Sequence, residues 1–106
     1  MVYNRNKQPS GAPYRQWALW TDMDRSPYLN MAIDEALLIT AAHRQQPLFR
    51  LYGWDRPALS IGYMQDREAA PGQHAVVRRP TGGGVVDHTH DITYTVVFPP
   101  EHPLYN

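Results

Sequence analysis

Residues 78–91, with the sequence RRPTGGGVVDHTHD, bring two arginines, three consecutive glycines and two histidines into one short stretch. Arginine binds phosphate and carboxylate groups, glycine lets a ligand approach the backbone, and histidine can bind a metal, carry a proton or make a structural hydrogen bond. These residue types predict an anion site or a metal site, with a plain tight turn as the simpler interpretation.

The three glycines, Gly82, Gly83 and Gly84, allow two interpretations. A tight connection between two strands needs one or two glycines for its positive φ angles. A third glycine costs a further ~0.5–1 kcal/mol relative to alanine, which suggests that the backbone lies against something that a Cβ would obstruct. The spacing matches neither a Walker loop nor a GxGxxG motif, so a ligand cradle and a plain turn both remain open.

Arg78 and Arg79 directly precede this loop on a predicted strand. Because side chains alternate along a strand, only one of the two can point into a cleft lined by glycine. That arginine is a candidate clamp for phosphate or carboxylate, while two solvated surface arginines are the alternative.

His88 and His90 would share one face if a strand continued through them, with Asp87 and Asp91 nearby. A metal-binding β protein is therefore one hypothesis. The H-x-H pattern lacks a third ligand at convincing spacing, so a hydrogen-bonding histidine in a pocket wall is favoured and no metal is assigned.

The composition limits the classes of protein to which this chain can belong. The chain has 106 residues, which suits one domain, and its ten basic and ten acidic side chains cancel. Because the formal net charge is zero, no overall electrostatic attraction draws the chain to nucleic acid or to an anionic membrane, and neither is expected as a partner. There is no cysteine, which excludes disulfides and thiolate chemistry within this chain and fits a reducing compartment.

No apolar run approaches the roughly 20 residues of a membrane span. The polar opening, residues 1–15, also lacks the apolar centre of a secretion signal. We therefore expect a cytoplasmic location. Residues 1–13 are predicted to be a flexible lead-in, and residues 14–106 the folded part.

The clearest predicted element is a helix within residues 26–44, with Ser26 as N-cap and Pro27 at the first helical position. Its apolar face is predicted to consist of Leu29, Ile33, Ala36, Leu37 and Thr40. Asp34 and Glu35 are adjacent and point about 100° apart on a helix, so they are interpreted as part of the solvated face.

Alternation and β-branched residues predict the strands. A first strand is expected over residues 14–20, and residues 47–52 and 58–65 are expected to pair as a hairpin. Residues 74–79 and 84–88 should form a second pair around the glycines, and residues 91–99 are the strongest β segment. The predicted fold is α+β, with a mixed, largely antiparallel sheet and one main amphipathic helix.

Four stretches, taken in order, resemble the lipoate–protein ligase family and its octanoyltransferase and biotin-ligase relatives. They are NMAIDEALL at 30–38, LFRLYGWDRPALSIGYMQ at 48–65, VVRRPTGGGVVDH at 76–88 and DITYTVV at 91–97. By this resemblance residues 14–106 are part of a lipoate ligase catalytic domain, its N-terminal half, built around a curved, mostly antiparallel sheet.

The resemblance implies ATP-dependent acyl transfer. Lipoate, or octanoate, would react with ATP and Mg²⁺ to give an acyl adenylate, and the acyl group would pass to a lysine of a lipoyl carrier domain in a 2-oxoacid dehydrogenase or glycine cleavage complex. It also implies that Arg79 is the clamp and that His88 closes the pocket wall. The implied substrate and nucleotide site consists of Arg79, Thr81, Gly82, Gly83, Gly84, Val85, Val86, Asp87 and His88.

The sequence departs from the family pattern at Asp87 and at Thr89, where the family often has Asp or Gly, and it also lacks the family's catalytic lysine. Asp87 stands where the family usually has an apolar residue, and a carboxylate repels a nearby phosphate. The family's catalytic lysine lies well downstream of the glycines, whereas the one lysine here is Lys7, so no catalytic residue is assigned. We therefore expect an incomplete ligase. The alternatives are a site completed by a second chain or by self-association, and a non-catalytic module that binds the lipoyl group or the carrier.

Overall fold

The structure is a computed structural model that describes residues 2–4, 16–70, 72 and 74–101. Its elements, in chain order, are β1 (Val2–Asn4), β2 (Ala18–Arg25), α1 (Pro27–Ile39), η2 (Ala41–His43), β3 (Leu48–Trp54), β4 (Ala58–Ile61), η3 (Arg67–Ala69), β5 (Ala75–Arg78), β6 (Val86–Asp87) and β7 (Thr93–Val97). Of the lead-in predicted at 1–13, only β1 is described; the other residues lie outside the described part of the chain.

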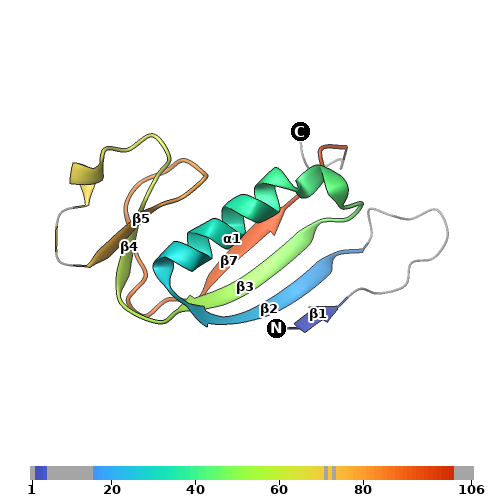
Figure 1. Cartoon of the computed structure of the whole chain (residues 1–106), viewed down its shortest axis with the longest axis horizontal. Helices are drawn as coiled ribbons and strands as arrows, with labels where there is room; N and C mark the ends of the chain where they lie inside the picture. Colours follow the sequence, from blue (N-terminus) through green and yellow to red (C-terminus); the bar gives the residue numbers. More distant parts are fainter. Residues whose placement is uncertain (1, 5–15, 71, 73, 102–106) are drawn as a thin grey trace.

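The strands form two mixed sheets. The larger sheet has the order β1-β2-β3-β7, and the smaller has the order β5-β4-β6. Neighbours β2 and β3 are parallel, as are β4 and β5, while the other neighbouring strands are antiparallel. Helix α1 lies across one face of the larger sheet, and the smaller sheet stands at the end of the molecule near the start of α1 (Figure 1). The predicted α+β class is therefore confirmed.

Both predicted strand pairings within this fold are wrong. Residues 47–52 do not form a hairpin with residues 58–65, because β3 is already paired on both edges, with β2 and with β7. Strands β5 and β6 do not pair with each other either, since they flank β4 on opposite sides. The glycine connection consequently spans the width of β4 and is not a hairpin turn.

The first strand begins later than predicted. Strand β2 starts at Ala18 and continues through residues 21–25, beyond the end predicted at residue 20. The strongest predicted β segment, residues 91–99, contains β7 and is confirmed. Within the described residues, no helix has the length and apolar character needed to cross a membrane.

The start of α1 agrees with prediction, but its buried face does not. The Ser26 hydroxyl accepts a hydrogen bond of 3.1 Å from the Leu29 amide, and Pro27 is the first helical residue. The residues of α1 that are buried are Pro27, Asn30, Met31 and Asp34. Leu29, which was predicted to face the core, is 44% exposed.

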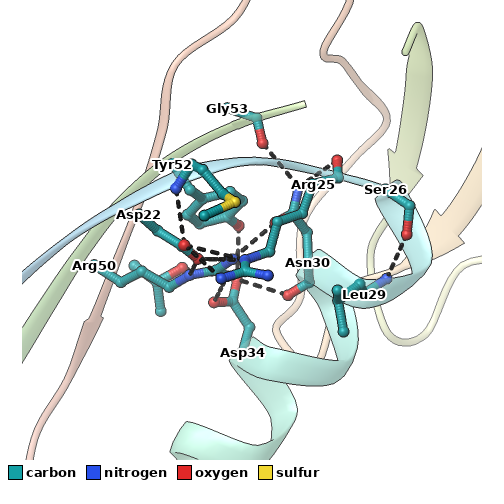
Figure 2. Close-up of polar contacts among 11 residues, drawn as sticks. Asp22, Arg25, Ser26, Leu29, Asn30, Asp34, Arg50, Tyr52 and Gly53 are labelled. Carbon is teal, nitrogen blue, oxygen red and sulfur yellow. Dashed lines mark hydrogen bonds and ion pairs between the residues drawn. The ribbon is translucent and has the colours of Figure 1, made fainter. Parts of the chain in front are cut away.

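Polar side chains occupy the interface between helix and sheet because they bind a buried arginine (Figure 2). Arg50 on β3 is fully buried, and its Nε and Nη2 atoms donate to the Asp22 carboxylate over 3.1 and 2.9 Å. Its Nη1 donates to Asp34 over 2.8 Å and to the Asn30 carbonyl, and its Nη2 also donates to the Asn30 side chain. All five N–H groups of this guanidinium are thereby satisfied.

Asp34 is therefore buried and paired, which corrects its predicted place on the solvated face; Glu35, by contrast, is exposed. Asp34 also accepts hydrogen bonds from the Tyr52 hydroxyl over 2.7 Å and from Thr95 on β7 over 2.8 Å. Burial and the neighbouring Asp34 raise the pKa of Tyr52, which keeps its hydroxyl a donor. One carboxylate on α1 thus connects the helix to two strands of the larger sheet.

Candidate acyl-binding site

A cavity of about 240 Å³ lies between α1, β7 and the residues that follow β5. Met31, Leu38 and Trp54 contribute apolar surface, and Arg79, His88 and Thr93 supply polar groups. Asp34 also lines the cavity, but its charge is compensated by Arg50. The site is therefore an apolar chamber with a group of polar side chains that includes one arginine.

Arg79 faces the glycine loop, residues 82–84, as predicted, and Arg78 does not. The Nη2 atom of Arg79 donates to the carbonyls of Gly82 and Gly84 over 3.1 and 2.7 Å, and its Nη1 donates to Ser60 over 2.6 Å. Arg78 instead donates to backbone carbonyls of residues 62, 63 and 65. The alternation of side chains along β5 separates the two arginines as expected.

Arg79 keeps donors available for a ligand. Its Nε–H and one Nη1–H make no hydrogen bond within the described part of the chain, so two of its five N–H groups are free to bind an anion. Burial lowers the pKa of Arg79, which shows that its charged form is incompletely solvated. A carboxylate or a polarised carbonyl oxygen beside it would compensate for that loss of solvent.

The conformation of the glycine loop supports the turn interpretation at Gly83 and leaves the ligand cradle as a prediction. Gly83 has a φ of +107°, which side-chain-bearing residues rarely adopt, so it is needed for the turn itself. A Cβ on Gly62 would lie 2.2 Å from the Gly83 carbonyl oxygen, so the loop packs against a glycine of the chain itself. A Cβ on Gly82 or Gly84 would meet no atom within 4 Å, which leaves one side of the loop open.

The glycine loop turns carbonyl groups toward Arg79. Hydrogen bonds from the amides of Arg79 and Tyr63, to Ile61 and Thr81 respectively, anchor the start of the loop. Within the residues that the structure describes, the amides of Gly82, Gly83 and Gly84 donate to no acceptor, and these glycines do not line the cavity. Because the N–H and C=O of one trans peptide point in opposite directions, the Gly83 amide points away from the guanidinium, and Arg79 itself is the donor that faces the cavity.

His88 is buried and belongs to the wall of the cavity, as predicted. Its ring stacks on Trp54 with centroids 4.0 Å apart and an angle of 17°. Its Nε2 lies 2.8 Å from the Ser60 hydroxyl, and its Nδ1 pairs with Asp91. His90 is exposed, and no cluster of three metal-binding side chains occurs among the described residues.

The remaining predicted residues divide into two groups. Thr81 lines the cavity together with Arg79 and His88. Val85, Val86 and Asp87 are exposed and do not line it. The Asp87 carboxylate accepts hydrogen bonds from the Thr89 hydroxyl and amide, and these bonds lower the pKa of Asp87. It therefore stays ionised and is engaged with its own turn.

Ser60 and Asp91 contact predicted site residues, although Ser60 was not singled out from the sequence and Asp91 was considered only beside a possible metal site. Ser60 lies in β4, far in sequence from both Arg79 and His88, and no local pattern marks it as a partner of either. Asp91 follows His88 by three residues, a spacing that could have indicated the pair. Both residues contact the predicted site through side chains that only the fold brings together.

Comparison with known proteins identifies the family that has this fold and site. The sequence model of the lipoyl protein ligase A/B catalytic domain matches residues 26–105. The chain belongs to this family. The resemblance drawn from the four sequence stretches is thereby confirmed.

Several relatives with curated names are octanoyltransferases. Octanoyltransferase LipM of Moorella thermoacetica is 41% identical over 102 residues, which cover 87% of this chain and 37% of that protein. The LipM protein of Bacillus subtilis is 40% identical over 95 residues, covering 82% of this chain and 34% of that protein. The chain thus spans little more than a third of the length of these relatives.

A solved structure shares the fold. A proposed lipoate protein ligase from T. acidophilum, solved with bound lipoic acid, has a TM-score of 0.64 and 26% identity, over 74% of this chain and 36% of that chain. A second structure of the same protein gives a TM-score of 0.62. These values agree with the N-terminal part of a catalytic domain, as the resemblance implied.

Proposed function

We propose that this chain supplies the acyl-binding part of an enzyme that transfers octanoyl or lipoyl groups to a protein lysine. The observation that carries the proposal is the apolar cavity of about 240 Å³ with Arg79 in its lining. Ligand pockets commonly measure about 300–1,000 Å³. A chamber below that range suits a narrow aliphatic chain better than a nucleotide.

The polar groups of the site suit the carbonyl end of such a chain. The two unbonded N–H groups of Arg79 could receive an oxygen that becomes negative during acyl transfer. Thr81 and His88 complete the polar part of the wall. Because the charge of Asp34 is compensated by Arg50, it does not repel an acyl oxygen strongly.

Octanoyl transfer is favoured over ATP-dependent ligation. The relatives at about 40% identity are named octanoyltransferases, and a transferase moves an acyl group that is already activated. ATP and Mg²⁺ are therefore requirements of the ligase alternative only. Val85, Val86 and Asp87, predicted as nucleotide contacts, lie outside the cavity and keep that role only as a prediction.

The attacking group must come from elsewhere. The sequence has no cysteine, and its one lysine is Lys7. We propose that a further segment or a second chain supplies the catalytic nucleophile, and that a lipoyl carrier domain accepts the acyl group. The alternative, a non-catalytic module, would bind the same acyl chain without a catalytic segment or second chain. The cytoplasmic location stays a prediction.

Calorimetric titration of the 106-residue chain with octanoate, and separately with ATP, tests the proposal. Octanoate should bind, and Leu38→Trp should weaken its binding at least about tenfold, because indole would fill the apolar chamber. Leu29→Trp on the same helix is the matched control, since Leu29 is similarly exposed but does not line the cavity. Binding of ATP without octanoate, or equal octanoate affinity in both variants, would contradict an acyl site here.

A further inference from the structure

Four side chains from separate parts of the sequence form one chain of hydrogen bonds beneath the glycine loop. Arg79 contacts Ser60 over 2.6 Å, Ser60 contacts His88 over 2.8 Å, and His88 pairs with Asp91. Strand β4 contributes Ser60, and His88 and Asp91 lie between β6 and β7. Ser60 and Asp91 are therefore connected to the proposed acyl site, although the proposed function gives neither residue a role.

The chemistry of the groups determines which atom donates at each step. A guanidinium can only donate, so the Ser60 oxygen accepts from Arg79. A carboxylate accepts, so the proton of neutral His88 lies on Nδ1, facing Asp91. The Ser60 hydroxyl therefore donates to Nε2 of His88. All three hydrogen bonds run in the same direction, from Arg79 to Asp91, and each polarises the next.

A serine, a histidine and an aspartate in this order resemble a hydrolytic triad, but the geometry contradicts a nucleophilic role. Ser60 is 0% exposed and does not line the cavity, so a substrate carbonyl cannot reach it. Its oxygen also accepts a hydrogen bond from a cation, which reduces its nucleophilicity. What the arrangement can do is hold the Arg79 guanidinium in one orientation.

We propose that Ser60, His88 and Asp91 are positioning residues that hold Arg79 against the glycine loop, with its unbonded N–H groups available to the acyl carboxylate or carbonyl. Ser60 holds Nη1 while the Gly82 and Gly84 carbonyls hold Nη2. His88 and Asp91 orient the Ser60 hydroxyl so that its oxygen accepts from Arg79. This inference rests on the proposed acyl-binding function.

The first test compares two probes of equal chain length, octanoate and octan-1-ol, in calorimetric titrations. Ser60→Ala removes one charge-assisted hydrogen bond from Arg79, so octanoate affinity should fall about tenfold. Affinity for octan-1-ol should stay unchanged, because the alcohol lacks the negative charge that Arg79 receives. Ser26→Ala, which removes the cap of α1 at a residue that does not line the cavity, is the control for lost stability and should change neither affinity.

Equal losses for both probes would mean that Ser60 is merely structural, and no loss, or tighter octanoate binding, would equally overturn the proposal. A second readout needs no ligand. NMR order parameters of the Gly82, Gly83 and Gly84 amides should fall in Ser60→Ala while those of α1 stay unchanged, because a loosened Arg79 releases the two loop carbonyls.

If the Ser60→Ala protein does not fold, the Asp91→Asn variant tests the positioning proposal instead. The Asp91 side chain is partly exposed, and asparagine is a weaker acceptor for His88, so the same fall in the order parameters of the loop amides is expected to a smaller extent. Unchanged loop order parameters in the folded Asp91→Asn protein would overturn the inference. If the unmodified chain binds neither probe but the loop order parameters respond, the proposed acyl site fails and the positioning chain stands.

Discussion

Arg78 and Arg79 are neighbours in sequence with different environments in the fold. Arg78 donates to backbone carbonyls of the segment after β4, and Arg79 to the glycine loop and Ser60. Alternation along the strand predicted this separation, because successive side chains of β5 point to opposite faces. The same argument could not show that the guanidinium of Arg79 would be fixed by a buried serine, since Ser60 belongs to a different strand.

Gly83 and Gly84 should respond differently to alanine. Gly83→Ala forces a side chain into a φ of +107°, with its Cβ 3.1 Å from Arg79, and should lower the free energy of unfolding by about 1–3 kcal/mol. Gly84→Ala has open space and no positive φ, so its effect should stay within about 1 kcal/mol. Urea denaturation of both variants checks the difference.

Octanoate titration of the Gly84→Ala protein then tests whether the glycine loop contacts the ligand or serves only as a turn. If a ligand lies against Gly84, the added methyl group should weaken binding in a stable protein. An unfolded Gly84→Ala protein, or equal destabilisation by both alanines, would show that all these glycines serve only the turn.

The elements are held together by a buried ion-pair network at the interface between α1 and the larger sheet. Arg50 on β3 joins Asp22 on β2 to Asp34 on α1, and its guanidinium lies 3.7 Å from the Tyr52 ring centre. Burial by itself would raise the pKa of Asp22, but hydrogen bonds from Arg25, the Met23 amide and Arg50 lower it overall. The network positions the helix over β7, and Asp34 connects it to the wall of the cavity.

Arg50→Met should destabilise the fold severely. The substitution leaves the buried Asp34 carboxylate without its cation, which typically costs about 3–5 kcal/mol, while Asp22 keeps its ion pair with Arg25. Arg56→Met is the matched control, because Arg56 forms an exposed ion pair with Asp55 that is worth at most about 1 kcal/mol. Chemical denaturation measures both, and similar losses would mean that the buried network adds no stability beyond a surface pair.

At the scale of the whole molecule, the cavity lies where the two sheets meet. The hydrophobic core occupies the same junction and comprises Met31, Tyr52, Trp54, Ala58 and Val77. Among the described residues, β7 pairs on one edge only, with β3, and Ile92 and Tyr94 beside that free edge are 75% and 64% exposed. Exposed edges with apolar side chains tend to pair with another chain.

We therefore expect the 106-residue chain to self-associate through β7. Sedimentation velocity over a range of concentrations should show a dimer that Tyr94→Lys weakens, because a charged edge resists pairing. Tyr63→Lys, at a similarly exposed tyrosine outside β7, is the control. A monomer at all concentrations, or the same weakening by both variants, would exclude this edge as the contact.

Local signals account for the elements that were predicted correctly. Ser26 and Pro27 mark the start of α1 because capping and a fixed proline φ depend only on neighbouring residues. The β-branched run within 91–99 likewise predicted β7. The strand pairings were wrong because pairing depends on which edges are free, and the alternation of one strand carries no information about the edges of another.

The sequence by itself determined the family, the predicted α+β class, the start of α1 and the residue types gathered around the glycine loop. Tertiary structure alone decided which face of α1 is buried, because Asn30 and Asp34 are stabilised inside only by Arg50, a partner on another element. It also decided that Ser60 and Asp91 belong to the site. Hydrogen bonds between residues far apart in sequence depend on the path of the whole chain, and a pattern read along one segment does not record that path.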